Sequence, residues 1–79
     1  MGILLGLLED NSIFVRSWSI SGLCLIGRRD EYRRSEIADR IRRLQNDRSV
    51  AIRVRVRNAL AALEDDRVMI PASWVKAIE

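Results

Sequence analysis

Histidine is absent from the sequence, and cysteine and proline each occur only once. Because the Ser-His-Asp and Cys-His kinds of active site need a histidine, both are excluded, as are histidine-containing metal sites. The single cysteine, Cys24, can form neither an intramolecular disulfide nor a cysteine cluster for zinc, and it is expected to be a small buried apolar residue. We therefore expect a non-enzymatic protein without cofactor or metal, in a reducing, cytoplasmic setting.

Long apolar runs and phosphate-binding glycine loops are missing as well. The opening "MGILLGLLED" is too short to span a bilayer, has no positively charged segment before it and runs directly into Glu9 and Asp10. We expect no membrane partner and interpret this stretch as part of the fold. With 79 residues, 48% of them hydrophobic, the chain is expected to form one small domain over residues 1–79.

Arginine is the abundant charged residue. The chain has 14 lysines and arginines, of which only Lys76 is a lysine, against 11 aspartates and glutamates, giving a net charge of +3. Because the two signs are interspersed along the chain, this excess favours an anionic partner only modestly.

An internal repeat emerges when the chain is shifted by 37 positions. "LLEDNSIFVRSWSISGLCLI" (7–26) then aligns with "LQNDRSVAIRVRVRNALAAL" (44–63). The identical pairs are Leu7/Leu44, Asp10/Asp47, Ser12/Ser49, Arg16/Arg53 and Leu23/Leu60. Because Ile37 and Ile41 fall on Trp74 and Ile78, a third, truncated copy is predicted to begin near Pro71. Self-similarity of this period is typical of proteins built from stacked structural repeats.

Residues 51–60, "AIRVRVRNAL", alternate apolar residues with arginines, as a half-buried strand does. Over the longer span 49–64, apolar residues recur at helical spacing, and a strand of that length would be unusual. These residues are Ile52, Val56, Ala59, Leu60 and Leu63, with a narrower second stripe of Val50, Val54 and Ala61. The longer span therefore predicts a helix that is buried on more than one side.

The chain as a whole predicts helices over 2–9, 12–27, 34–46, 49–64 and 71–78. Short turns at 10–11 and 47–48, and longer connections near 28–33 and 65–70, are expected to join them. Ser35 is the expected N-cap of the third helix, whose outer face carries the acid-first pairs Glu36–Arg40 and Asp39–Arg43. Helices with one apolar stripe alternate with helices that are apolar on several sides, as a stack of helical hairpins requires.

The two copies resemble HEAT repeats. The resemblance lies in "LLEDNSIFVRSWSISGL" and "LQNDRSVAIRVRVRNAL", each with an Asp in the inter-helix turn, an apolar-Arg pair beginning the second helix and a Leu seven positions after that Arg. It implies an all-α fold, a short right-handed α-solenoid of antiparallel helical hairpins with about two repeats plus half-repeats at the ends. Such a unit is either a whole protein or a piece of a longer array.

The resemblance also implies a hydrogen-bonded ladder along the stack, in which Asp10 pairs with Arg16 and Asp47 with Arg53. The sequence departs from the HEAT pattern because it lacks the proline often found in the first helix. Ser19 and Gly22 also replace larger or alanine-like residues, which implies unusually close packing between repeats.

A HEAT-like stack is expected to be an interaction scaffold that presents its second helices to a protein partner. The candidate partner-binding residues, taken at equivalent repeat positions, are Ile20, Ser21, Arg57 and Asn58. Because "ILLGLL" is no polar cap, we also expect self-association into a homo-oligomer or contact with a longer array. Phe14 and Trp18, one turn apart, are expected to pack in the core or between repeats; the other interpretation is an exposed anchor for a partner.

Direct nucleic-acid binding is the alternative function. Arg53 and Arg57 share a helix face one turn apart, and Arg42 and Arg43 lie on the preceding predicted helix, so arginines of 34–46 and 49–64 could contact phosphates. A helix-turn-helix with 49–64 as its recognition helix is disfavoured, because that helix is apolar over most of its circumference.

Overall fold

The structure, a computed structural model, describes residues 2–74. Those residues contain no strand and form four α-helices: α1 (Gly2–Leu7), α2 (Ile13–Arg29), α3 (Glu31–Arg42) and α4 (Val50–Glu64). A further helical turn begins at Ala72, and the rest of the predicted helix 71–78 lies outside the described residues. The predicted all-α class is confirmed, and residues 51–60 lie entirely within α4.

The helices α2 and α4 begin in the same way, 37 residues apart. The Oγ atoms of Ser12 and Ser49 each accept a hydrogen bond from the backbone N–H three residues on, both at 3.3 Å. Two residues earlier, Asp10 Oδ1 accepts from the N–H of Ser12 at 2.8 Å and Asp47 Oδ1 from that of Ser49 at 2.9 Å. Identical residues at the repeat spacing therefore give identical local structure.

The junction between α2 and α3 differs from the prediction. Asp30 alone separates the two helices: its backbone N–H closes the last turn of α2, and its side chain accepts from the N–H groups two and three residues on. The predicted connection at 28–33 and the predicted N-cap Ser35 are therefore wrong. Asp30 supplies a cap five residues earlier than Ser35, which lies inside α3.

The helix α3 also ends earlier than predicted, and its charge pairing differs. It stops at Arg42, and residues 43–46 form turns. Asp39 Oδ1 accepts from Arg42 Nη1 at 2.8 Å, in place of the predicted Arg43. Because both side chains are exposed, this pair contributes little to stability.

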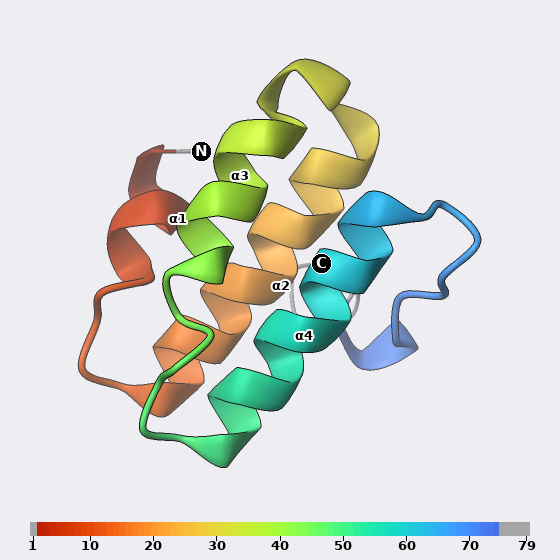
Figure 1. Cartoon of the computed structure of the whole chain (residues 1–79). Helices are drawn as coiled ribbons and strands as arrows, with labels where there is room; N and C mark the ends of the chain where they lie inside the picture. The colour runs from red at the N-terminus through yellow and green to blue at the C-terminus, as the bar shows by residue number, and fades with distance from the viewer. Residues whose placement is uncertain (1, 75–79) are drawn as a thin grey trace.

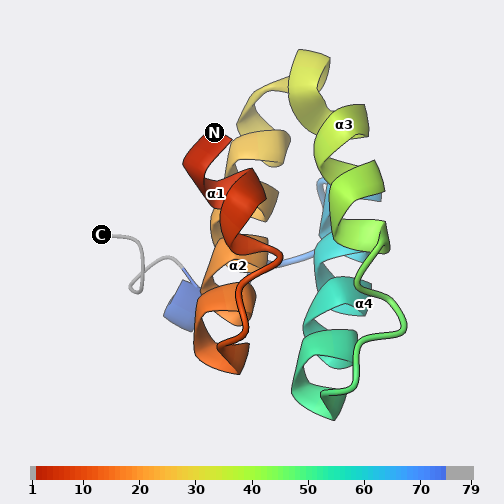
Figure 2. The same cartoon turned by 90° about the vertical axis from the view of Figure 1, so that its left-hand side faces the viewer.

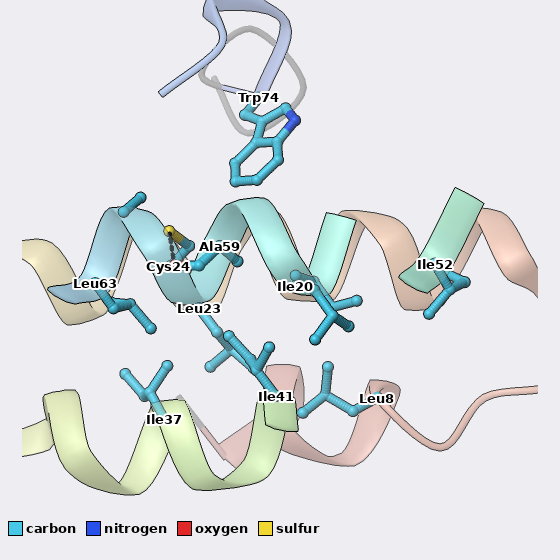
Figure 3. Close-up of a cluster of buried hydrophobic side chains, with 12 residues drawn as sticks. Leu8, Ile20, Leu23, Cys24, Ile37, Ile41, Ile52, Ala59, Leu63 and Trp74 are labelled. Atoms are coloured by element: carbon cyan, nitrogen blue, oxygen red, sulfur yellow. Dashed lines mark hydrogen bonds between the residues drawn. The ribbon is translucent and has the colours of Figure 1, made fainter. Parts of the chain in front are cut away.

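The four helices form two antiparallel hairpins that lie side by side, α1 with α2 and α3 with α4 (Figures 1 and 2). The helix α2 contacts the other three, and its contact with α4 is the most extensive. Figure 3 shows α1 and α3 on one side of the core and α2 and α4 across it. The first helices of the two hairpins therefore form one layer, and the second helices form the other.

The core lies between these layers and along the contact of α2 with α4. Its buried side chains are Leu8, Ile20, Leu23, Cys24, Ile37, Ile41, Ile52, Val56, Ala59, Ala62, Leu63 and Trp74. Gly27 allows α4 to come close, because a Cβ atom at this position would lie 2.7 Å from Leu63 Cδ2. Cys24 is fully buried, with Sγ 3.7 Å from the carbonyl oxygen of Ala59, so its predicted role as a small core residue is confirmed.

Trp74 lies where the repeat does not predict it. The shift of 37 places it at the position of Ile37, which belongs to α3 and faces the core from the first layer. Figure 3 shows Trp74 instead on the far side of α2 and α4. Arg28 holds the connection before it, donating to the carbonyl oxygen of Asp66 at 2.6 Å and to that of Val68. Up to residue 74, the predicted third copy therefore does not continue the layer of α1 and α3.

Candidate interaction surface

Arg16 joins the turns of the two hairpins. Its Nη1 donates to the carbonyl oxygens of Asp10 at 2.8 Å and Asn11 at 3.0 Å, and its Nη2 donates to Asp47 Oδ1 at 3.1 Å. Arg16 is 7% exposed, so this guanidinium is nearly removed from water. The Asp10–Arg16 contact implied by the resemblance is thus made through the backbone carbonyl of Asp10, while the side-chain pairing runs from one hairpin to the next.

Arg53 reproduces only the first half of this arrangement. Its Nη1 donates to the carbonyl oxygen of Asp47 at 2.6 Å, as Arg16 does to that of Asp10, but the side chain is exposed. Among residues 2–74, no carboxylate pairs with Arg53 as Asp47 pairs with Arg16. The guanidinium of Arg53 is therefore without an ion pair in this part of the chain, whereas its counterpart Arg16 forms one with Asp47.

A groove of about 550 Å³ follows the outer side of α4. Its lining residues are Gln45, Val50, Arg53, Val54, Val56, Arg57, Leu60, Ala61 and Glu64. At 100° of rotation per helical residue, Val54, Arg57 and Ala61 project on the side of α4 opposite Ala59. Because Ala59 contacts Cys24 of α2, the groove faces away from α2. A smaller hollow of about 280 Å³ adjoins the groove at Leu60 and Glu64 and extends to α3. We call this outer side of α4 the open face.

At the 37-residue repeat spacing, the open face of α4 corresponds to the surface of α2 that packs against α4. A shift of 37 positions places Arg57, Leu60, Ala61 and Glu64 on Ile20, Leu23, Cys24 and Gly27. All four residues of α2 are buried. The last two contact α4 directly, at the carbonyl of Ala59 and at Leu63. In α4 the same positions are exposed or half-buried, as are Val50 at 64% and Val54 at 38% exposure. The second hairpin thus carries an uncovered counterpart of a surface that is covered in the first.

The four predicted partner-binding residues divide between surface and core. Arg57 lines the groove of the open face, and Asn58 is exposed beside a different hollow, of about 170 Å³, near Trp74. Ile20 and Ser21 are 0% and 1% exposed, so their assignment to a partner surface is wrong. The repeat spacing equates these positions correctly, but α4 covers α2. The side chain of Ser21 accepts a hydrogen bond from Arg55 Nη1 of α4 at 2.7 Å.

Another hollow, of about 480 Å³, lies between Trp74 and residues of α2 and α4. It is lined by Ile13, Phe14, Ser17, Trp18, Arg55, Ser73 and Trp74. Phe14 is 79% exposed, so the expectation that it packs in the core or between repeats is wrong, whereas Trp18 is half-buried. The guanidinium carbon of Arg55 lies 5.1 Å from the centre of the Trp74 ring, within cation–π range.

Several arginines that could have bound phosphates donate instead to groups of the protein. Arg34 Nε donates to the carbonyl oxygen of Gly27 at 2.9 Å, at the end of α2. Arg42 pairs with Asp39, whereas Arg43 and Arg57 are exposed. The alternative nucleic-acid surface therefore retains Arg43, Arg53 and Arg57, and the last two share the groove with Glu64.

Among residues 2–74, no group of three or more histidine, cysteine or acidic side chains could hold a metal ion. None of the helices in this part of the chain is both long enough and apolar enough to cross a bilayer. Comparison with protein-family models, with curated proteins and with solved structures finds no match.

Proposed function

We propose that this chain is a non-enzymatic scaffold for protein–protein interaction, built as a short right-handed α-solenoid of HEAT-like hairpins, and that it binds its protein partner through the open face of α4. The correspondence between this face and the buried face of α2 supports the proposal. A surface whose counterpart in the same chain packs against a helix has the spacing of ridges and grooves that another helix needs.

The chemistry of the open face fits a protein partner. Most of the side chains of α4 that line it are apolar, among them Val54, Leu60 and Ala61, while Arg57 lies between Val54 and Leu60 along the helix and Glu64 lies at its end. Apolar area combined with arginine is typical of protein interfaces. The lining side chains are aliphatic, arginine, glutamine and glutamate, and they provide no nucleophile paired with a base.

The same surface is less suited to nucleic acid. Phosphate contacts require unpaired cations along a strand, and affinity rises with the number of charges neutralised. Glu64 lies in the groove that Arg53 and Arg57 line, and its carboxylate would repel a phosphate bound there. We therefore propose protein binding, in preference to nucleic-acid binding, as the function of the open face.

The test compares two exposed alanines of α4. Ala61 lines the groove, whereas Ala51, near the start of the same helix, does not. Ala61→Arg places a long charged side chain in the groove, and Ala51→Arg is the matched control. Wild type and both variants are used as baits in the native host, and the captured protein and nucleic acid are identified by mass spectrometry. We expect Ala61→Arg to lose protein partners that wild type and Ala51→Arg both retain. Equal capture by all three baits would contradict binding at the open face.

A further inference from the structure

We infer that the occupant of the open face is a second copy of this chain, bound head to tail through its α1/α2 hairpin. This inference rests on the proposed function, because it names the partner of that same surface. Three features carry it: the carboxylate that Arg53 would meet, the apolar side of α2 that would meet the groove, and the contact between the two hairpins, which shows how such units pack.

Arg53 of one copy and Asp10 of another match a pair that already exists inside the chain. Arg16 contacts the carbonyl of Asp10 with Nη1 and the carboxylate of Asp47 with Nη2. Arg53 makes the equivalent carbonyl contact to Asp47. Asp10 has the same local geometry as Asp47, since its Oδ1 accepts a hydrogen bond from the N–H of the serine two residues on, and Asp10 is exposed. In a head-to-tail pair, Arg53 would meet Asp10 as Arg16 meets Asp47.

The apolar surfaces correspond as well. The residues of α4 that are buried toward α2 and the core include Ile52, Ala62 and Leu63. A shift of 37 positions back along the sequence places them on Val15, Leu25 and Ile26 of α2, which are apolar and half-buried in the single chain. Placing a second copy against the open face would cover these residues together with Leu60 and Ala61. The covered apolar area would favour association.

The contact between the two hairpins defines the geometry of the proposed pair. The helix α4 packs beside α2, and Figure 1 shows both running in the same direction. Repeating this step once more places α2 of the second copy beside α4 of the first. Because the two surfaces involved are different, each copy keeps one of them free after pairing, and the assembly can grow instead of closing as a dimer. The mean mass in solution would then rise with concentration.

A charge exchange between two variants tests the arrangement. Arg53→Glu places two acids opposite each other in every head-to-tail contact, and Asp10→Arg places two arginines there. Each variant alone should associate at least about tenfold more weakly than wild type. An equimolar mixture should recover association, because the introduced glutamate of one variant then faces the introduced arginine of the other, while Arg53 and Asp10 form the original contact. Sedimentation velocity over a range of protein concentrations measures all of these.

The control variant lies in the same turn as Asp10. Asn11 is exposed, so Asn11→Arg introduces the same side chain next to Asp10 without removing the carboxylate. This variant should associate as wild type does, and mixing it with Arg53→Glu should not restore full association. Far-UV circular dichroism and thermal melts confirm that each variant is folded, which matters because Asp10→Arg removes the acceptor for the N–H of Ser12.

The outcomes separate this inference from the proposed function. Wild type that remains a monodisperse monomer at high micromolar concentration would overturn the second copy as occupant. Asp10→Arg associating as wild type while Arg53→Glu is monomeric would indicate a symmetric pairing of two α4 helices and overturn the head-to-tail arrangement.

If wild type is monomeric but Ala61→Arg still loses protein partners that Ala51→Arg retains, only the identity of the occupant is wrong. If Ala61→Arg changes neither association nor capture, the open face is not a binding surface.

Discussion

Arg16 of the first hairpin donates to Asp47 of the second at 3.1 Å, and the two side chains are only 8% and 12% exposed. The same guanidinium donates to two carbonyl oxygens in the turn of its own hairpin. One side chain thus connects both inter-helix turns. Among residues 2–74, the other three ion pairs are local in sequence and more exposed, so they contribute less to the contact between hairpins.

Removing the guanidinium of Arg16 is expected to destabilise the protein strongly. Arg16→Met keeps most of the apolar stem but leaves the carboxylate of Asp47 without its partner and two carbonyls without a donor, so the free energy of unfolding should fall by about 2–3 kcal/mol. The matched control is Arg53→Met, at the equivalent but exposed position, which should cost less than about 1 kcal/mol. Urea unfolding followed by circular dichroism measures both. Equal losses would mean that the hairpins do not share this ion pair.

The carboxylate of Asp47 is expected to make stability depend on pH in the acid range. The backbone N–H of Ser49 and the guanidinium of Arg16 hold the pKa of Asp47 below its ordinary value of 3.8. Because the native pKa lies below the unfolded one, the resulting stabilisation is complete above the unfolded value and is lost as the pH falls through the native value. The difference in unfolding free energy between wild type and Asp47→Asn should therefore be constant near neutral pH and shrink below about pH 4. Urea unfolding at a series of pH values tests this, and a difference independent of pH would refute it.

The fold could be predicted where many residues give the same signal. In α4 the apolar spacing over 49–64 predicts a helix despite the local alternation, and burial of Ile52, Val56 and Leu63 overrides the weak helix preference of its valines. The start of α3 depends on a single residue. Asp30 and Ser35 can both cap a helix, and only the hydrogen bonds at the end of α2 show that Asp30 does so.

The candidate site was predictable only in part, because burial depends on what lies next to each repeat. The spacing equates Ile20 with Arg57, but it does not show that α4 covers the first and leaves the second open. Trp74 shows the same limit: its repeat position predicts the layer of α3, whereas the chain takes it to the other side of α2 and α4, where it packs under Arg55. Sequence periodicity indicates which residues are equivalent but not which neighbour each one has.

Cys24 is expected to be unreactive in the folded protein. It lies in the contact of α2 with α4, and burial raises the pKa of its thiol from 9.0 to about 11. Since the thiolate is the reactive form, this shift alone should slow its reaction with a disulfide reagent at pH 8 about 100-fold relative to the protein unfolded in urea. The release of the coloured thiol product gives both rates. Rapid reaction under native conditions would mean that the contact of α2 with α4 opens readily.

Duplex DNA and RNA are expected not to bind measurably. The net charge is only +3, and of the arginines that could contact phosphates, Arg42 is paired with Asp39, while Arg53 and Arg57 share the groove with Glu64. Fluorescence anisotropy of a labelled duplex titrated with the protein at low salt, where phosphate contacts are strongest, should therefore stay flat. The opposite result would support the alternative function if binding weakened steeply with salt. Arg57→Gln would then decide whether the open face is responsible, because loss of one phosphate contact lowers the slope of log affinity against log salt by about one.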